Sequence, residues 1–219
     1  MKRIFLTFAA ASVILSACNN EQKSGESKTD SSATAKADTP AAKPQAAPPL
    51  DSAAMAKAWM DFATPGEMHK MLAKYAGTWE AEVTQWMAPG APPTKSKATE
   101  VITMDLNGLY QVTNYTGDMM GAPFRGRGTI GYDNIKKMFI QTWIDNMGSG
   151  IIYMTGSYDE ATKTINMKGK QSDPATKQDS DLRQEVKLTD DNNYSFVMYG
   201  TGPDGKEAKF MEGIFKRKK

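Results

Sequence analysis

The sequence predicts a mainly β protein, an antiparallel sandwich or barrel of about ten strands preceded by one or two short helices. From Gly77 onward, apolar and polar residues tend to alternate, with the two-residue period of strands that are buried on one face. Turn-forming residues recur there every eight to twelve positions, a spacing typical of antiparallel sandwiches and barrels. Just before Gly77, apolar residues recur instead at the three- and four-residue intervals of a helix.

The composition of the 219 residues excludes several classes of function. Lys and Arg total 27 and Asp and Glu total 25, so we expect no nucleic-acid partner. A single histidine, His69, and a single cysteine, Cys18, cannot supply a zinc or haem site, or a nucleophile with its histidine base. Gly126-Arg127-Gly128 lies within a strand pattern and opens no helix, so it is not a nucleotide-binding loop. We therefore expect no cofactor and no metal, and assign no catalytic residue.

Residues 1–17 resemble a bacterial lipoprotein signal peptide. Two basic residues precede an apolar run over positions 4–15, which is too short to span a bilayer as a helix. The run ends in Leu15-Ser16-Ala17-Cys18, which resembles the lipobox of bacterial lipoproteins. The resemblance implies that Cys18 becomes the lipidated N-terminus and holds the protein on a membrane. A chance cysteine in an ordinary secretory signal is the alternative.

The residues after Cys18 predict a location and a tether. Asn19 stands where an aspartate would resemble an inner-membrane retention signal, so we expect the outer membrane in the envelope of a Gram-negative bacterium. Residues 18–50 are rich in Ala, Ser, Thr, Pro and Lys and have almost no large apolar side chain with which to build a core. We therefore predict that this segment holds the folded part away from the lipid surface.

Residues 51–76 carry signals for a helical lead-in. Asp51 can cap a first helix that runs through Phe62. Thr64-Pro65-Gly66-Glu67 combines a cap, a proline in the first turn and a glutamate at the third helical position, which predicts a second helix to about Tyr75. Four apolar residues of this helix share a face that should contact a core: Met68, Met71, Leu72 and Tyr75. His69 lies on another face, and we expect it to be exposed.

Ten candidate strands follow between Gly77 and the C-terminus. Their predicted starts are Thr78, Thr94, Leu109, Ala122, Lys137, Gly150, Lys163, Asp179, Tyr194 and Lys206. Asp133-Asn134 can form a type I turn, and Asp173-Pro174 places proline at a favoured turn position. Asp133 and Asp159 each follow a tyrosine at the end of a strand and precede a lysine, which indicates two copies of one hairpin loop.

The predicted hairpin over residues 126–145 leaves its orientation open. Its glycines suit a strand that coils sharply or that another group approaches closely. With an even-numbered loop, one face carries Ile130, Tyr132, Phe139, Gln141, Trp143 and Asp145, and the other carries Arg125, Arg127, Met138, Ile140 and Ile144. A one-residue change of register would exchange the two faces, so alternation alone does not decide which is inside.

Five short motifs stand out over residues 63–217. They are Pro65-Gly66-Glu67-Met68-His69-Lys70, Gly77-Thr78-Trp79, Gly121-Ala122-Pro123-Phe124, Gly131-Tyr132-Asp133 and Trp143-Ile144-Asp145. In combination they resemble the bacterial DUF1579 family, a family of unknown function. Gly77-Thr78-Trp79 after a short helix also resembles the opening of lipocalin-like barrels. This implies a lipocalin-like barrel over residues 77–219, with Trp79 closing its floor and Arg217 stacked on the indole. Simple core packing is the alternative role for Trp79.

Two functions of different classes fit such a barrel. A ten-stranded barrel is wider than the eight-stranded kind, so it has room for a small apolar ligand. Trp79, Phe139 and Trp143 would then line the cavity, and Gln141 or Arg125 would orient the polar end of the ligand. The alternative is a non-enzymatic envelope module with a filled barrel, which presents loops such as residues 118–121 to a protein partner. An open apolar interior would favour ligand binding, and a packed one would favour the module.

The sequence leaves carboxylate catalysis open. A pair of carboxylates about 5 to 10 Å apart can hydrolyse a glycosidic bond. Five acidic residues lie on candidate strands: Glu80, Glu82, Asp105, Asp145 and Glu185. Charged residues on an antiparallel sheet usually form its solvated face, however, so we expect a protein that is not an enzyme.

Overall fold

The computed structural model describes residues 51–202 and 204–219. The predicted signal peptide and tether, with Cys18, lie outside the described residues, so lipidation stays a prediction. Two helices, α1 (Ser52–Ala63) and α2 (Glu67–Ala73), precede the strands. No helix in the described ranges is long and apolar enough to cross a membrane.

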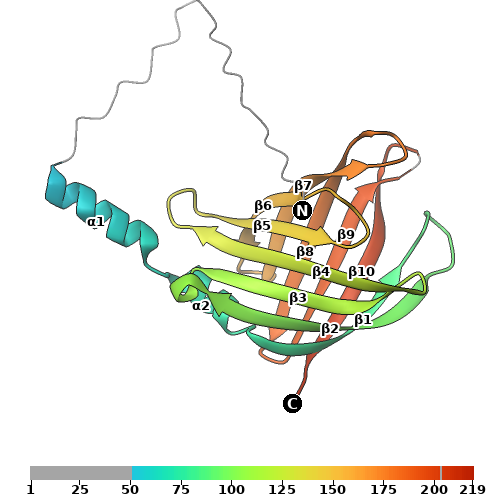
Figure 1. The fold of residues 1–219 in the computed structure, drawn as a ribbon, viewed down its shortest axis with the longest axis horizontal. Coiled ribbons are helices and arrows are strands. Elements are labelled where there is room, and N and C mark those ends of the chain that lie inside the picture. The colour runs from blue at the N-terminus through green and yellow to red at the C-terminus, as the bar shows by residue number, and fades with distance from the viewer. Residues whose placement is uncertain (1–50, 203) are drawn as a thin grey trace, which may run out of the picture. The chain divides into compact units, whose positions relative to one another are not determined.

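Ten antiparallel strands form a closed barrel, which confirms the predicted fold class (Figure 1). β1 pairs with both β2 and β10, and each other strand pairs with its neighbours in the chain, so the barrel has no free edge. Every strand begins within two residues of its predicted start. The strands are β1 (Gly77–Gln85), β2 (Thr94–Asp105), β3 (Tyr110–Met119), β4 (Ala122–Asp133), β5 (Met138–Asp145), β6 (Ile152–Asp159), β7 (Thr164–Asp173), β8 (Gln178–Asp190), β9 (Asn193–Thr201) and β10 (Glu207–Arg217). A short 3-10 helix (Leu106–Gly108) connects β2 to β3.

One four-residue hairpin loop occurs three times, after Asp133, Asp159 and Asp173. In each, the aspartate side chain accepts hydrogen bonds from the backbone N–H groups two and three residues on. A lysine ends each loop with a φ between 54° and 58°. Both predicted copies are confirmed, and the turn at Asp173 is a third copy that was recognised in the sequence only by its proline.

The two helices form where expected, but Thr64 does not cap α2. Asp51 caps α1, because its side chain accepts a hydrogen bond from the backbone N–H of Ala54 at 2.7 Å. The hydroxyl of Thr64 donates to the carbonyl oxygen of Met60 at 2.6 Å, so it terminates α1 instead. The residue before α2 is Gly66, which has no side chain with which to cap the helix.

His69 is buried, and the expectation that it would be exposed is wrong. Its Nδ1 accepts a hydrogen bond from the backbone N–H of Gly66 at 3.0 Å, which supplies a cap from the third position of α2. The ring packs edge-on against Tyr132 and keeps 2% of its exposure. Burial lowers the pKa of His69, so the neutral form that accepts this bond is favoured.

One end of the barrel is closed by α2 and an aromatic cluster around Trp79. The indole is fully buried, its Nε1 donates to the carbonyl oxygen of Tyr75 at 2.9 Å, and Tyr194 packs edge-on at 4.8 Å. The guanidinium of Arg217 lies 4.3 Å from the indole centroid, so the stack that the lipocalin resemblance implies is present. Arg217 also donates to the carbonyl oxygens of Lys74 and Ala76, which ties β10 to the end of α2. We call this end of the barrel the floor.

Candidate ligand-binding cavity

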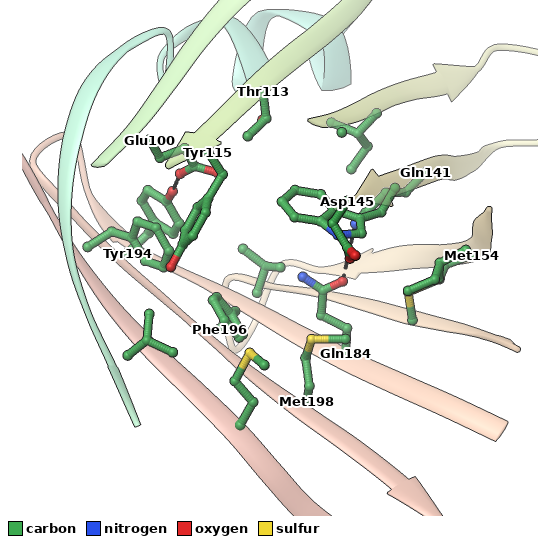
Figure 2. Close-up of a pocket in the computed structure, with 18 of the residues that line it drawn as sticks. Glu100, Thr113, Tyr115, Gln141, Asp145, Met154, Gln184, Tyr194, Phe196 and Met198 are labelled. Atoms are coloured by element: carbon green, nitrogen blue, oxygen red, sulfur yellow. Dashed lines mark hydrogen bonds between the residues drawn. The ribbon is translucent and has the colours of Figure 1, made fainter. Parts of the chain in front are cut away.

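The barrel contains a cavity of about 270 Å³ (Figure 2). Side chains from both helix α2 and the strands line it, and most of them are aromatic or aliphatic. Gln85, Asp118 and Gln171, near the strand ends opposite the floor, also belong to the lining, so the cavity extends toward that end. Its volume is close to the lower end of the range of about 300–1,000 Å³ that is usual for ligand pockets.

Glycines on β4 make room for Trp143 at the wall of this cavity. A Cβ atom on Gly126 would lie 2.1 Å from the indole ring, and one on Gly128 would lie 3.1 Å from it. Both glycines face inward, so the indole lies directly against the β4 backbone. Close approach is therefore the role of these two glycines, one of the two roles that the sequence predicted.

The inner face of the β4–β5 hairpin is the one that carries Ile130, Gln141 and Trp143. Arg125 and Arg127 alternate with the inward glycines and are exposed on the outer face. The prediction that Arg125 orients a ligand inside the barrel is therefore wrong. The inward space beside Gly126 and Gly128 is occupied by the Trp143 ring, so it has no room for an arginine side chain.

The structure brings two of the five predicted binding residues to the cavity. Gln141 and Trp143 line it; the indole Nε1 of Trp143 donates to Asp145 at 2.9 Å. Trp79 and Phe139 are not part of the lining, because both are fully buried among other side chains. Phe139 packs edge-on against Tyr132 in the core, and Trp79 belongs to the floor. Their predicted place on the cavity wall is therefore wrong.

Amide side chains supply part of the polar lining. Nε2 of Gln141 on β5 donates to Oε1 of Gln184 on β8 at 3.3 Å. Nε2 of Gln111 on β3 donates to the carbonyl oxygen of Leu72 at 2.9 Å, which fixes the end of α2 to the barrel. Gln141 and Gln184 thus present hydrogen-bonding groups to the cavity, while Gln111 also has a structural role.

Glu100 on β2 is a buried carboxyl in the lining that was not among the predicted site residues. It keeps 9% of its exposure, and its Oε2 accepts a hydrogen bond from the hydroxyl of Tyr194. In the strand register it lies between Trp79 on β1 and Tyr115 on β3. Burial raises the pKa of Glu100 to about 8. Burial, together with the Glu100 carboxyl, also raises the pKa of Tyr115 to about 12.

The five acidic residues considered for catalysis do not assemble in the cavity. Glu80, Glu82 and Asp105 are exposed on the outside of the barrel. Glu185 pairs with Arg183, which also binds Glu207 at 2.7 Å. Asp145 is the one member of the five that lines the cavity, so these residues form no hydrolytic pair there.

The fold and the site define a closed ten-stranded antiparallel barrel with a largely apolar internal cavity. Residues 64–217 match the family described as "Protein of unknown function (DUF1579)", and the chain belongs to this family, as the motifs indicate. No curated protein matches the sequence.

Two solved structures share the fold. One is Rv2717c from M. tuberculosis, with a TM-score of 0.55 and 11% identity over 71% of this chain and 100% of that one. The other is the S-type phycobiliprotein lyase CPES from Guillardia theta, with a TM-score of 0.50 and 7% identity over 74% of this chain and 97% of that one. At these identities, the likeness extends to the fold alone.

Proposed function

We propose that this protein binds one small, largely apolar ligand inside its barrel. The cavity of about 270 Å³ carries this proposal. An apolar ligand that covers the apolar lining removes this surface from water, which is favourable. The interior is not filled, which removes the main support for the alternative of a filled interaction module. The amide groups of Gln141 and Gln184 are placed to orient a polar group of the ligand.

Uptake of a neutral apolar fluorophore, N-phenyl-1-naphthylamine, tests this function. We expect saturable binding of one molecule per chain, and we expect Thr113→Trp to abolish it by filling the cavity. Thr113 is buried and points into the cavity from β3 (Figure 2).

Thr116→Trp is the matched control, because Thr116 lies on the same strand and is exposed on the outer face. It should leave uptake unchanged. Circular dichroism establishes that both variants are folded. No uptake by the parent protein, or equal uptake by folded Thr113→Trp, would contradict the proposal.

We propose further that Cys18 carries a lipid that anchors the protein to the outer membrane. The proposal rests on the Leu15-Ser16-Ala17-Cys18 sequence, the lack of any other cysteine and the polar segment that follows. Several acyl chains bind a bilayer almost permanently, since each buried methylene contributes about 0.8 kcal/mol.

Metabolic labelling with a palmitate analogue in the native bacterium measures this acylation. The wild-type chain should be labelled, and Cys18→Ser should lose the label, because the acceptor sulfur is gone. Label retained by Cys18→Ser, or absent from the wild-type chain, would show that the lipoprotein assignment is wrong.

A further inference from the structure

The charged side chains that line the cavity are all acidic. They are Glu100, Asp118 and Asp145; among residues 51–202 and 204–219, no lysine, arginine or histidine lines the cavity. The basic residue expected to orient a ligand, Arg125, lies on the outside of the barrel. An anionic group inside the cavity would therefore meet carboxyl groups without any compensating cation, whereas a cationic group would meet groups of opposite charge.

Of these three carboxyls, Glu100 is the one that is buried and can still accept a further hydrogen bond or an ion pair. Asp118 is exposed near the end of β3. Asp145 already accepts hydrogen bonds from Trp143 and from the backbone N–H of Met147, both at 2.9 Å. Within residues 51–202 and 204–219, Glu100 accepts one hydrogen bond, from Tyr194, and has no ion-pair partner.

In the part of the chain that the structure describes, the titratable groups beside Glu100 are tyrosines, and no cationic side chain pairs with it. Tyr115 on β3 and Tyr194 on β9 lie beside it, together on one side of the cavity (Figure 2). Tyr75, which follows α2, packs edge-on against the Tyr194 ring at 5.8 Å. Arg217 of β10 lies against Trp79 and donates to backbone carbonyl oxygens rather than to Glu100. Aromatic faces attract ammonium groups most strongly where water is excluded.

We propose that the ligand of this cavity is an apolar amine or quaternary ammonium compound whose cationic nitrogen pairs with the carboxylate of Glu100. The proposal rests on the proposed ligand-binding function and specifies its substrate class. Burying a cation is costly unless an opposite charge meets it, and Glu100 meets that requirement. The apolar lining then covers the hydrocarbon part of the ligand.

The pairing couples binding to the protonation of Glu100. With a pKa of about 8, Glu100 is protonated in most molecules of the free protein at pH 7. A permanent cation therefore either binds the few molecules in which Glu100 is ionised or displaces the proton from the others. The affinity for such a cation should therefore rise about tenfold between pH 7 and pH 9. Burial raises the pKa values of both Tyr75 and Tyr115, so neither side chain competes in this range.

Three probes with the same hydrocarbon chain test the charge preference: octyltrimethylammonium, octanol and octanoate. Calorimetry on the full-length Cys18→Ser chain measures their affinities without a competing acyl group. We expect the cation to bind more tightly with rising pH, octanoate to bind more weakly and octanol to be unaffected. Glu100→Gln, which keeps the size of the side chain, should make the affinity for the cation independent of pH. Glu82→Gln is the control, because Glu82 is exposed on the outside of the barrel; it should keep the wild-type profile.

The outcomes distinguish failure of the amine assignment from failure of ligand binding itself. Octanol binding without a preference for the cation at pH 9, or a cation profile that is unchanged in folded Glu100→Gln, would overturn the amine assignment and leave ligand binding intact. Failure of all three probes to bind would overturn both. The wild-type pH profiles alone decide the sign of the charge preference, so the test does not depend on the variant being folded.

Discussion

Trp79→Ala is expected to lower the free energy of unfolding by about 3 to 5 kcal/mol, the usual range for truncating a large buried aromatic side chain. The indole is fully buried, donates to Tyr75 and carries Arg217 on its face. The substitution removes all three interactions and leaves a void between α2 and the barrel. Because a domain has a total stability of about 5 to 15 kcal/mol, this loss should be visible as a large shift in denaturant midpoint.

Trp59→Ala is the matched control for this measurement. Trp59 on α1 keeps 66% of its exposure, so its truncation should change stability by less than about 0.5 kcal/mol. Urea titrations followed by circular dichroism compare the two variants. If Trp79→Ala cost no more than Trp59→Ala, Trp79 would not hold the floor together.

Trp143→Ala should affect ligand binding more than stability. The indole is half-buried at the cavity wall, so its removal enlarges an existing space, and the loss of stability should be clearly smaller than that of Trp79→Ala. Binding of N-phenyl-1-naphthylamine should weaken about tenfold, which corresponds to about 1.4 kcal/mol of lost contact with the probe.

Ile144→Ala controls for the position in the strand, because Ile144 follows Trp143 in β5 and is exposed on the outer face. It should change neither stability nor uptake appreciably. Equal losses of stability in the Trp79 and Trp143 variants, together with no uptake by the parent protein, would contradict the division of the barrel into a packed floor and an open cavity.

The strand pattern and turn chemistry predict most of this fold. Strand alternation and turn residues are local signals, so they locate the start of each strand to within two residues. The repeated Asp-to-Lys loops are also local, because the aspartate bonds to backbone groups only two and three residues away. Closure of the barrel was implied by the resemblance, since the contact of Trp79 with Arg217 joins the two ends of the folded sequence.

The site was harder to predict because it depends on which face of each strand is inside. β5 has large apolar residues on both faces, with Trp143 inside and Ile144 outside, so hydrophobicity alone does not distinguish them. The arginines of β4 indicate which face of the hairpin is inside. Arg125 and Arg127 must reach solvent, which places Gly126 and Gly128 inside, and with them Trp143, the register partner of Gly128.

Glu100 and His69 show two further limits of pattern reading. Glu100 alternates with Ala98 and Ile102, so an acid among inward apolar positions was a readable signal for a buried carboxyl. His69 packs against Tyr132 on β4 and accepts a hydrogen bond from Gly66, and the second contact depends on where α2 starts. The spacing of the methionines gave the correct core face of α2 but carried no information about that cap.

The methionines allow the most direct test of the central claim that the barrel interior is the binding site. Met154, Met198 and Met211 line the cavity, whereas Met87, Met120 and Met147 are exposed outside it. Methyl-labelled methionine therefore reports on both surfaces in one NMR titration with octanol. We predict saturable shifts of the interior methyl signals while the exposed ones stay unchanged. Shifts confined to the exposed methyl groups, or no shift at all, would contradict ligand binding inside the barrel.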